Sequence, residues 1–263
     1  MISVAHIINP VVADEFSDLL IAQPITFATM EIAKEFSKAS VDVNLYAIQY
    51  FDEERIPLPK DFIRVPDLTR SIADINVFKQ KRKLPFIKDI LDALYEVSRA
   101  EYYIYTNVDI GLQPYFYGVV DRIIEQGYDA FIINRRTIPG KYKTAEEIPL
   151  MYAEIGEKHQ GWDCFVFHQS LYPRFRLGTA CIGSGWIGRV MITNLAALAK
   201  KFEIFSELHA TFHIGNEKAW QAPQWDDYRE HNKNECRTIL TEFDQKYGPF
   251  DRKGLPGRFF SRL

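Results

Sequence analysis

The sequence lacks the features that place a protein in a membrane, in an oxidising compartment or on nucleic acid. No apolar run is long enough to span a bilayer, and no apolar core of a secretory signal is present. Only three cysteines occur, Cys164, Cys181 and Cys236, and their spacing fits neither a metal site nor a disulfide framework. The 32 basic and 35 acidic residues give a net charge of −3, which argues against a nucleic-acid partner. We therefore expect a cytoplasmic protein without a transmembrane segment.

Several motifs of nucleotide-using and hydrolytic enzymes are also missing. No G-x-x-x-x-G-K-[ST] loop is present, and no G-x-G-x-x-G follows the first expected strand. No G-x-S-x-G elbow occurs, and Gly183-Ser184-Gly185 is not one. P-loop enzymes, dinucleotide-binding enzymes and α/β-hydrolases therefore receive no support from the sequence.

Apolar residues make up 47% of the chain, and their spacing alternates between strand-like and helix-like in the first half. The expected strands cover residues 4–8, 41–47, 102–106, 130–133 and 163–167. The expected helices contain the apolar positions of residues 25–36, 87–94, 116–124 and 191–202. Prolines predict a loop over 57–66, and the tail from 248 is expected to be irregular.

This alternation predicts an α/β fold with a mostly parallel central sheet and helices on both faces. No linker or repeat divides the chain, so we expect one domain over residues 1–263. Within it, 1–135 would form a nucleotide-binding half, and 136–263 an acceptor half with the C-terminal tail.

The most informative stretch is Asn107-Val108-Asp109, directly after the expected strand 102–106. Residues two apart in an extended segment point to the same side. An amide carbonyl and a carboxylate there offer the hard oxygen ligands that Mn²⁺ or Mg²⁺ prefers. Ligands of such sheets bind beyond the carboxyl ends of the strands. The alternative interpretation is a simple turn after a strand.

A second stretch, from His213 to Trp220, combines three residue types that suit a bound diphosphate. A histidine can ligate a metal, a glycine lets the backbone approach a phosphate, and a lysine neutralises it. A surface turn with a capping glycine and a solvated lysine is the alternative.

Together the two stretches resemble nucleotide-sugar glycosyltransferases of the GT-A fold, so the resemblance implies a GT-A-like sandwich. Its hallmark is a D-x-D motif after a strand, and residues 102–112 are similar to it, with Asn107 in the first position. Retaining enzymes related to glycogenin carry a late H-x-x-G-x-x-K-P-W motif. Gly215, Lys218 and Trp220 match its G-x-x-K-x-W part, whereas His213 lies one residue closer to the glycine than in the motif.

The resemblance assigns roles to individual residues. It implies that Asp109 and His213 bind Mn²⁺ or Mg²⁺. It also implies that the nucleotide-sugar donor is contacted by a larger set, which comprises Asn107, Arg82, Lys83, Gly215 and Lys218.

Two further groups are candidates for the acceptor side and for proton transfer. Trp162 opens the strand after residues 137–160, which we expect to be a long loop, and Trp186 lies in the stretch 178–188, which is rich in small residues. Both could stack on a sugar. Asp163 and Glu217 are carboxylates that could act as a base.

We therefore expect a metal-dependent glycosyltransferase that moves a sugar from a nucleotide diphosphate sugar, by default a UDP-sugar, to an unknown acceptor. Inversion and retention at the anomeric carbon both remain open. The alternatives are a nucleotidyltransferase that forms nucleotide sugars, or a non-catalytic relative that binds carbohydrate.

Overall fold

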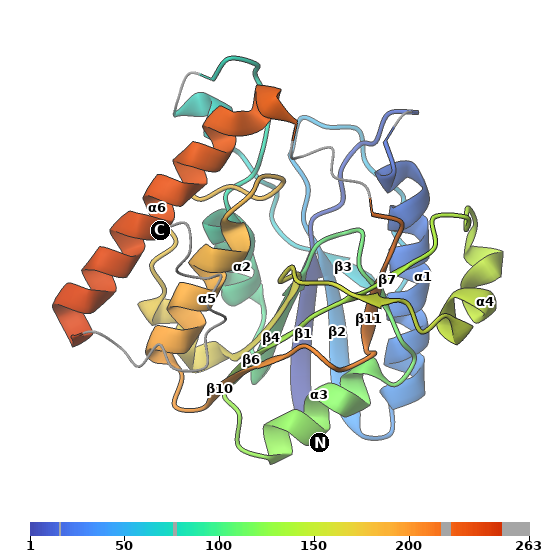
Figure 1. Cartoon of the computed structure of the whole chain (residues 1–263). Helices are drawn as coiled ribbons and strands as arrows, with labels where there is room; N and C mark the ends of the chain where they lie inside the picture. The colour runs from blue at the N-terminus through green and yellow to red at the C-terminus, as the bar shows by residue number, and fades with distance from the viewer. Residues whose placement is uncertain (16, 76–77, 217–221, 249–263) are drawn as a thin grey trace.

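A seven-stranded sheet forms the centre of the molecule (Figure 1) in a computed structural model that describes residues 1–15, 17–75, 78–216 and 222–248. Its strands, in spatial order, are β10 (Phe202–Phe205), β6 (Ala130–Ile133), β9 (Cys164–His168), β4 (Tyr102–Thr106), β1 (Ile2–Ile8), β2 (Val41–Ala47) and β3 (Phe62–Arg64). Neighbouring strands are parallel except where β9 runs against β4 and β6. The predicted α/β fold with a mostly parallel sheet is therefore confirmed.

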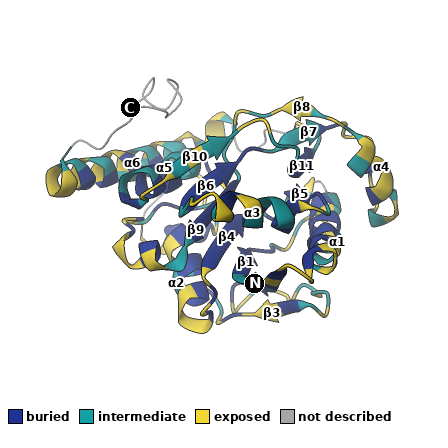
Figure 2. Cartoon of the chain, turned by 90° about the horizontal axis from the view of Figure 1, so that it is seen from below, coloured by how far each residue is buried: buried dark blue, intermediate teal, exposed yellow. Residues whose placement is uncertain are grey.

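Helices cover both faces of this sheet, as predicted. One layer contains α1 (Leu19–Ser37) and α3 (Phe116–Glu125), and the other contains α2 (Ile87–Val97), α5 (Ile187–Leu198) and α6 (Asp226–Tyr247). Alternate residues of β1 enter the two cores, because successive side chains of a strand point to opposite faces. Figure 2 shows the buried strands between helices whose outer sides are exposed. Among the described residues, no helix combines the length and apolarity needed to cross a bilayer.

A second, four-stranded sheet lies beside the carboxyl edge of the first. Its strands, in order, are β5 (Gly111–Leu112), β11 (Thr211–Ile214), β7 (Arg136–Ile138) and β8 (Glu157–Lys158). The ring of Phe212 lies so close to Gly111 that a Cβ added there would approach it to 2.5 Å. Only glycine fits at that position, and this close packing fixes β11 against β5.

Several expected boundaries were wrong, all where the local pattern was weak. The expected loop over 57–66 contains the short strand β3, which lies at the edge of the sheet. The expected loop over 137–160 contains β7, β8, a 3₁₀ helix (Ala145–Glu147) and α4 (Ile148–Ala153). The helix expected to reach Phe202 ends at Leu198, because Phe202 begins β10. The 22-residue helix α6 was not predicted.

A buried histidine connects β1, β4 and α3. The ring of His6 is fully buried, with Nδ1 2.9 Å from the Tyr117 hydroxyl and Nε2 2.9 Å from the Thr106 hydroxyl. Hydroxyl groups can donate or accept, so both ring nitrogens of a neutral imidazole are satisfied. Burial lowers the pKa of His6 to about 3, because a charged ring would lose its hydration.

We expect His6 to make the fold sensitive to mild acid. Between pH 6.5 and 3 the unfolded chain binds a proton at this histidine and the folded chain does not, so stability falls as the pH falls. Lowering the pH from 7 to 5 should cost the parent about 2 kcal/mol more than a His6→Gln variant. Urea unfolding at both pH values measures this difference. Equal losses in the two proteins would contradict the prediction.

Candidate active site

Polar side chains gather where β4 ends and β9 begins. Because β9 is antiparallel to β4, its first residue, Cys164, pairs with the last residue of β4, Thr106. Asn107, which follows β4, and Asp163, which precedes β9, therefore lie side by side at this edge of the sheet. Asn107 Nδ2 lies 3.5 Å from Asp163 Oδ1. The hydroxyl of Tyr105 donates to Asn107 Oδ1 at 3.1 Å and fixes which way the amide faces.

The second sheet brings His213 to Asp109 from 104 residues further along the chain. The pairing of Phe212 with Gly111 places the next residue of β11, His213, at the Asp109 turn. His213 Nε2 lies 3.2 Å from Asp109 Oδ2, and His213 Nδ1 lies 2.9 Å from the carbonyl oxygen of Gly215. A carbonyl oxygen only accepts, so Nδ1 carries a proton and Nε2 is the nitrogen that faces the carboxylate.

The two groups adjust each other's protonation. Burial alone would raise the pKa of Asp109, but the hydrogen bond and charge of His213, with the charge of Arg135, outweigh burial and lower it. Burial alone would lower the pKa of His213, but the Asp109 carboxylate outweighs burial and raises it. Asp109 is therefore held as a carboxylate at neutral pH.

This pair suits a divalent cation. Two donors at right angles around an ion with bonds of about 2.1 Å lie about 3 Å apart, close to the 3.2 Å between Asp109 Oδ2 and His213 Nε2. The other oxygen, Asp109 Oδ1, is buried without a hydrogen-bond partner among the described residues. The same residues contain no cluster of three or more His, Cys, Asp or Glu side chains at such a spacing. An ion here would thus take further ligands from amide oxygens, water or a bound phosphate.

Asp163 is buried beside a cation rather than open to solvent. Its Oδ2 lies 3.1 Å from Arg135 Nη1 and 3.9 Å from His159 Nδ1, and only 13% of the side chain is exposed. Burial raises the pKa of Asp163 and the charge of Asp109 adds to this, whereas Arg135 and His213 partly counteract it. Asp163 was predicted as a site residue, and its pairing with Arg135 was not predicted.

The two basic residues ahead of α2 differ in what they can offer a ligand. The Arg82 guanidinium lies 4.5 Å from the centre of the Trp225 ring and, within the described part of the chain, donates only to the Gly183 carbonyl, at 3.4 Å. No carboxylate of the described residues pairs with Arg82, and burial lowers its pKa. Lys83, in contrast, pairs with Asp52 and Glu53. Arg82 therefore retains donors for an anion, and Lys83 is already neutralised.

The two predicted acceptor tryptophans both lie near one arginine. The guanidinium carbon of Arg189 is 5.7 Å from the Trp162 ring and 4.3 Å from the Trp186 ring. Trp162 also packs against Gly188, where an added Cβ would come within 3.2 Å of the indole. Both tryptophans are partly buried against the core, and Trp186 stands directly before α5.

The remaining predicted residues fall into two groups. Gly215 has φ +72°, and its N–H donates to the Ile138 carbonyl at 2.9 Å, so the glycine is needed for backbone conformation. Glu217, Lys218 and Trp220 lie outside the described residues.

One buried residue that organises this region was missed. Asn232 of α6 is fully buried, and its Oδ1 accepts from the Cys181 N–H at 2.9 Å. Its Nδ2 donates to the carbonyls of Cys181 and Gly185, at 2.8 and 2.9 Å. Asn232 therefore fixes the segment that carries Trp186. The signal available was an asparagine in helical phase with Tyr228, Cys236, Ile239 and Phe243.

Comparison with known proteins identifies the fold. No protein-family model matches the chain, and no curated protein sequence matches it. Residues 1–349 of S. aureus TarS in complex with UDP-GlcNAc superpose with a TM-score of 0.55 at 8% identity, over 92% of this chain and 71% of that one. TarS 1–349 in complex with UDP gives 0.52 at 10% identity, over 96% and 73%. The predicted GT-A-like architecture is therefore confirmed.

Proposed function

We propose that this chain is a metal-dependent glycosyltransferase that uses a nucleotide diphosphate sugar, with a UDP-sugar as the expected donor. The observation that carries the proposal is the convergence of Asp109 and His213, 3.2 Å apart, beyond the carboxyl edge of the central sheet. Sheets of this kind bind ligands at that edge. The fold is shared with TarS, whose structures were determined with UDP-GlcNAc and with UDP.

The proposed donor site combines the metal pair with cationic and amide groups. Asp109 and His213 would hold Mn²⁺ or Mg²⁺, with the Asn107 carbonyl as a further oxygen. Bound there, the ion would neutralise the diphosphate as the glycosidic bond breaks. The free donors of Arg82 suit a phosphate. Lys218, proposed to add a second cation next to Gly215, lies outside the described residues.

Asp163 is proposed to serve the reaction in one of two ways. Its raised pKa makes it a better base for an incoming hydroxyl than an ordinary aspartate. Its contact with Asn107 also lets it orient that amide toward the donor. Glu217 is the other candidate base and lies outside the described residues. Both stereochemical outcomes stay open.

A thermal-shift panel tests the function directly. UDP, UDP-glucose and UDP-N-acetylglucosamine, each at about 100 times its Kd, should stabilise the protein by about 2.7 kcal/mol, but only with Mn²⁺. For a chain of this size this amounts to a rise of roughly 5–10 °C in Tm. The same rise without metal would overturn metal dependence. A response to UTP but not to UDP would favour a nucleotidyltransferase, and no response to any nucleotide would favour a non-catalytic relative.

A further inference from the structure

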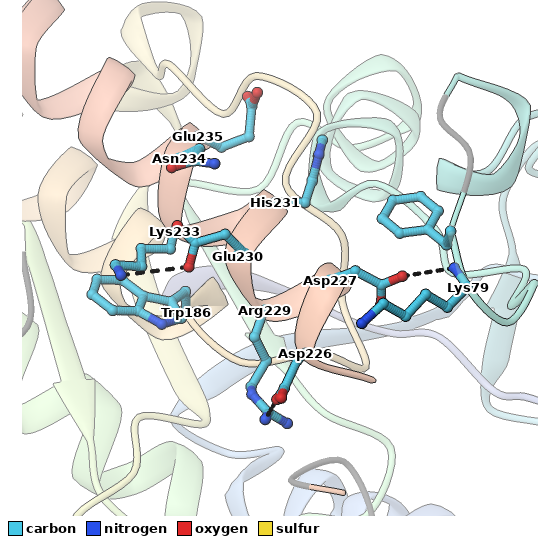
Figure 3. A pocket seen from close by; sticks show the side chains of 11 residues that line it. Lys79, Trp186, Asp226, Asp227, Arg229, Glu230, His231, Lys233, Asn234 and Glu235 are labelled. Carbon is cyan, nitrogen blue, oxygen red and sulfur yellow. Dashed lines mark hydrogen bonds and ion pairs between the residues drawn. The ribbon is translucent and has the colours of Figure 1, made fainter. Parts of the chain in front are cut away.

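A groove of about 900 Å³ runs along the first half of α6 (Figure 3). Lys79 stands at one side and Trp186 at the other, and α6 residues between Asp226 and Glu235 lie between them. Phe78 also lines the groove. Its volume is within the range of about 300–1,000 Å³ that is usual for ligand sites. The helix that lines the groove also contacts the segment of Arg82, a proposed donor residue, because the backbone N–H of Arg82 donates to the Tyr228 hydroxyl at 2.7 Å.

Both sides of the groove are anchored to α6, so the groove is formed before any ligand binds. Phe78 stacks on Tyr228 with ring centroids 4.0 Å apart and an interplanar angle of 9°. The N–H of Lys79 donates to Asp227 Oδ2 at 2.8 Å. On the other side, Asn232 holds the Gly185 carbonyl directly before Trp186. A preformed site avoids the free-energy cost of ordering loops around a ligand.

Trp186 is held in a strained backbone conformation. Its φ of +75° is the only positive value for a non-glycine residue in the described part of the chain. Such a conformation costs a bulky side chain about 1–3 kcal/mol, and it persists where the surroundings impose it, frequently at a ligand site. Glycine would remove the strain, yet a tryptophan occupies the position. The ring is partly buried against the core and also lines the groove.

The charges of the groove are mixed. Lys79, Arg229 and Lys233 oppose four carboxylates, those of Asp226, Asp227, Glu230 and Glu235. This balance gives no positive field for a polyphosphate or another polyanion. Instead it places donors and acceptors side by side, because Lys233 Nζ lies 3.4 Å from Glu230 Oε2 and 5.9 Å from the centre of the Trp186 ring.

We propose that this groove binds the acceptor of the transfer reaction as a neutral, polyhydroxylated carbohydrate chain. Sugar hydroxyls both donate and accept, so they match the Lys233–Glu230 pair. The apolar face of a sugar ring matches the indole of Trp186. The role of this carbohydrate as the acceptor rests on the proposed function, but carbohydrate binding in the groove can be tested without assuming that function.

Calorimetric titration with maltotetraose, cellotetraose and N-acetylchitotetraose, in the presence of UDP and Mn²⁺, tests the proposal. At least one of these neutral probes should bind, and tetragalacturonate, an anionic carbohydrate, should bind more weakly. Trp186→Ala should lower the affinity for the neutral probe about tenfold. Glu230→Gln should lower the affinity for the neutral probe about fivefold. This change keeps the shape of an exposed side chain and is not expected to affect folding. The matched controls Phe36→Ala on α1 and Glu96→Gln on α2 should bind like the parent.

The outcomes separate the groove from the donor site. Absence of binding by all three neutral probes, tighter binding of tetragalacturonate, or unchanged affinity in Glu230→Gln would overturn the proposal. The thermal shift with UDP and Mn²⁺ should be the same in every groove variant and in the parent. Binding of a neutral probe without any UDP response would instead reject the proposed transferase function and leave the groove as a carbohydrate site.

Discussion

Replacing Asp109 with asparagine should remove the Mn²⁺-dependent stabilisation by UDP. The amide keeps the size of the carboxylate, and its NH₂ group can donate to Nε2 of His213, so the fold should remain intact. It lacks the negative charge that a divalent cation requires, and His213 alone is a weak site. Calorimetric titration with Mn²⁺ should show that the metal affinity falls on the order of 100-fold or more. Mutating a residue that only hydrogen-bonds to a metal ligand already lowers metal affinity about 10- to 100-fold.

Asp42→Asn provides the matched control, because Asp42 is an exposed aspartate on β2 with no part in the proposed site. That variant should respond to UDP and Mn²⁺ like the parent. If Asp109→Asn keeps the full metal-dependent shift, the proposed ion site is wrong, whatever the donor is. If both variants lose the metal-dependent shift, the loss comes from the change in net charge and not from an ion site at Asp109.

The central strands could be predicted because they are apolar and buried. All five residues of β4 are buried, and the expected bounds of β2, β4 and β6 agree with the structure. Strands covered on both faces read as continuous apolar runs, which a local pattern reveals directly. The edge strand β3 is different, since only one of its three residues is buried and prolines surround it.

The residues of a strand do not by themselves determine whether it runs parallel or antiparallel to its neighbours. The strand at 164–168 was expected almost to the residue, but its antiparallel orientation was not. That orientation matters for the site, because it brings the residue before β9, Asp163, to the end of β4. Strand direction depends on how the chain crosses between distant elements, and 137–160 was wrongly expected to be a loop.

The helix α6 was missed although its buried positions carry a helical signal. Tyr228, Asn232, Cys236, Ile239 and Phe243 follow a spacing of three or four residues. The other positions are mostly polar, so the apolar stripe is narrow, and one of its members is an asparagine. Asn232 is buried because the backbone of a separate segment satisfies it, which is a tertiary effect.

The Asp109–His213 pair shows what a resemblance adds to local reasoning. Either stretch alone is also compatible with an ordinary turn. Only the resemblance to two family motifs predicted that both residues bind one ion, and in the structure Asp109 Oδ2 and His213 Nε2 lie 3.2 Å apart. Their role in binding metal stays a prediction, which the Asp109 experiment addresses.

Replacing Arg135 with methionine should destabilise the fold by about 3–5 kcal/mol at pH 7, the usual effect of removing one partner of a buried ion pair. Arg135 and Asp163 have side chains that are only 11% and 13% exposed, and their charged atoms lie 3.1 Å apart. Without Arg135, the Asp163 carboxylate would stay buried near the charge of Asp109. Urea unfolding of the variant and the parent measures the loss.

The double variant Arg135→Met with Asp163→Asn separates a charge effect from a packing effect. It removes both charges, so it should recover most of the stability, with a coupling energy of about 2–3 kcal/mol in a double-mutant cycle. Additive losses in that cycle would mean that Arg135 acts only through packing.

The pH dependence provides an independent check of the same argument. Burial already raises the pKa of Asp163 and Arg135 counteracts it, so the arginine variant should have a still higher value. A carboxyl whose folded pKa exceeds its unfolded pKa destabilises the fold only while it is ionised. The deficit of Arg135→Met relative to the parent should therefore shrink between pH 7 and pH 5. A deficit that stays constant over this range would show that Asp163 is not the group left unpaired.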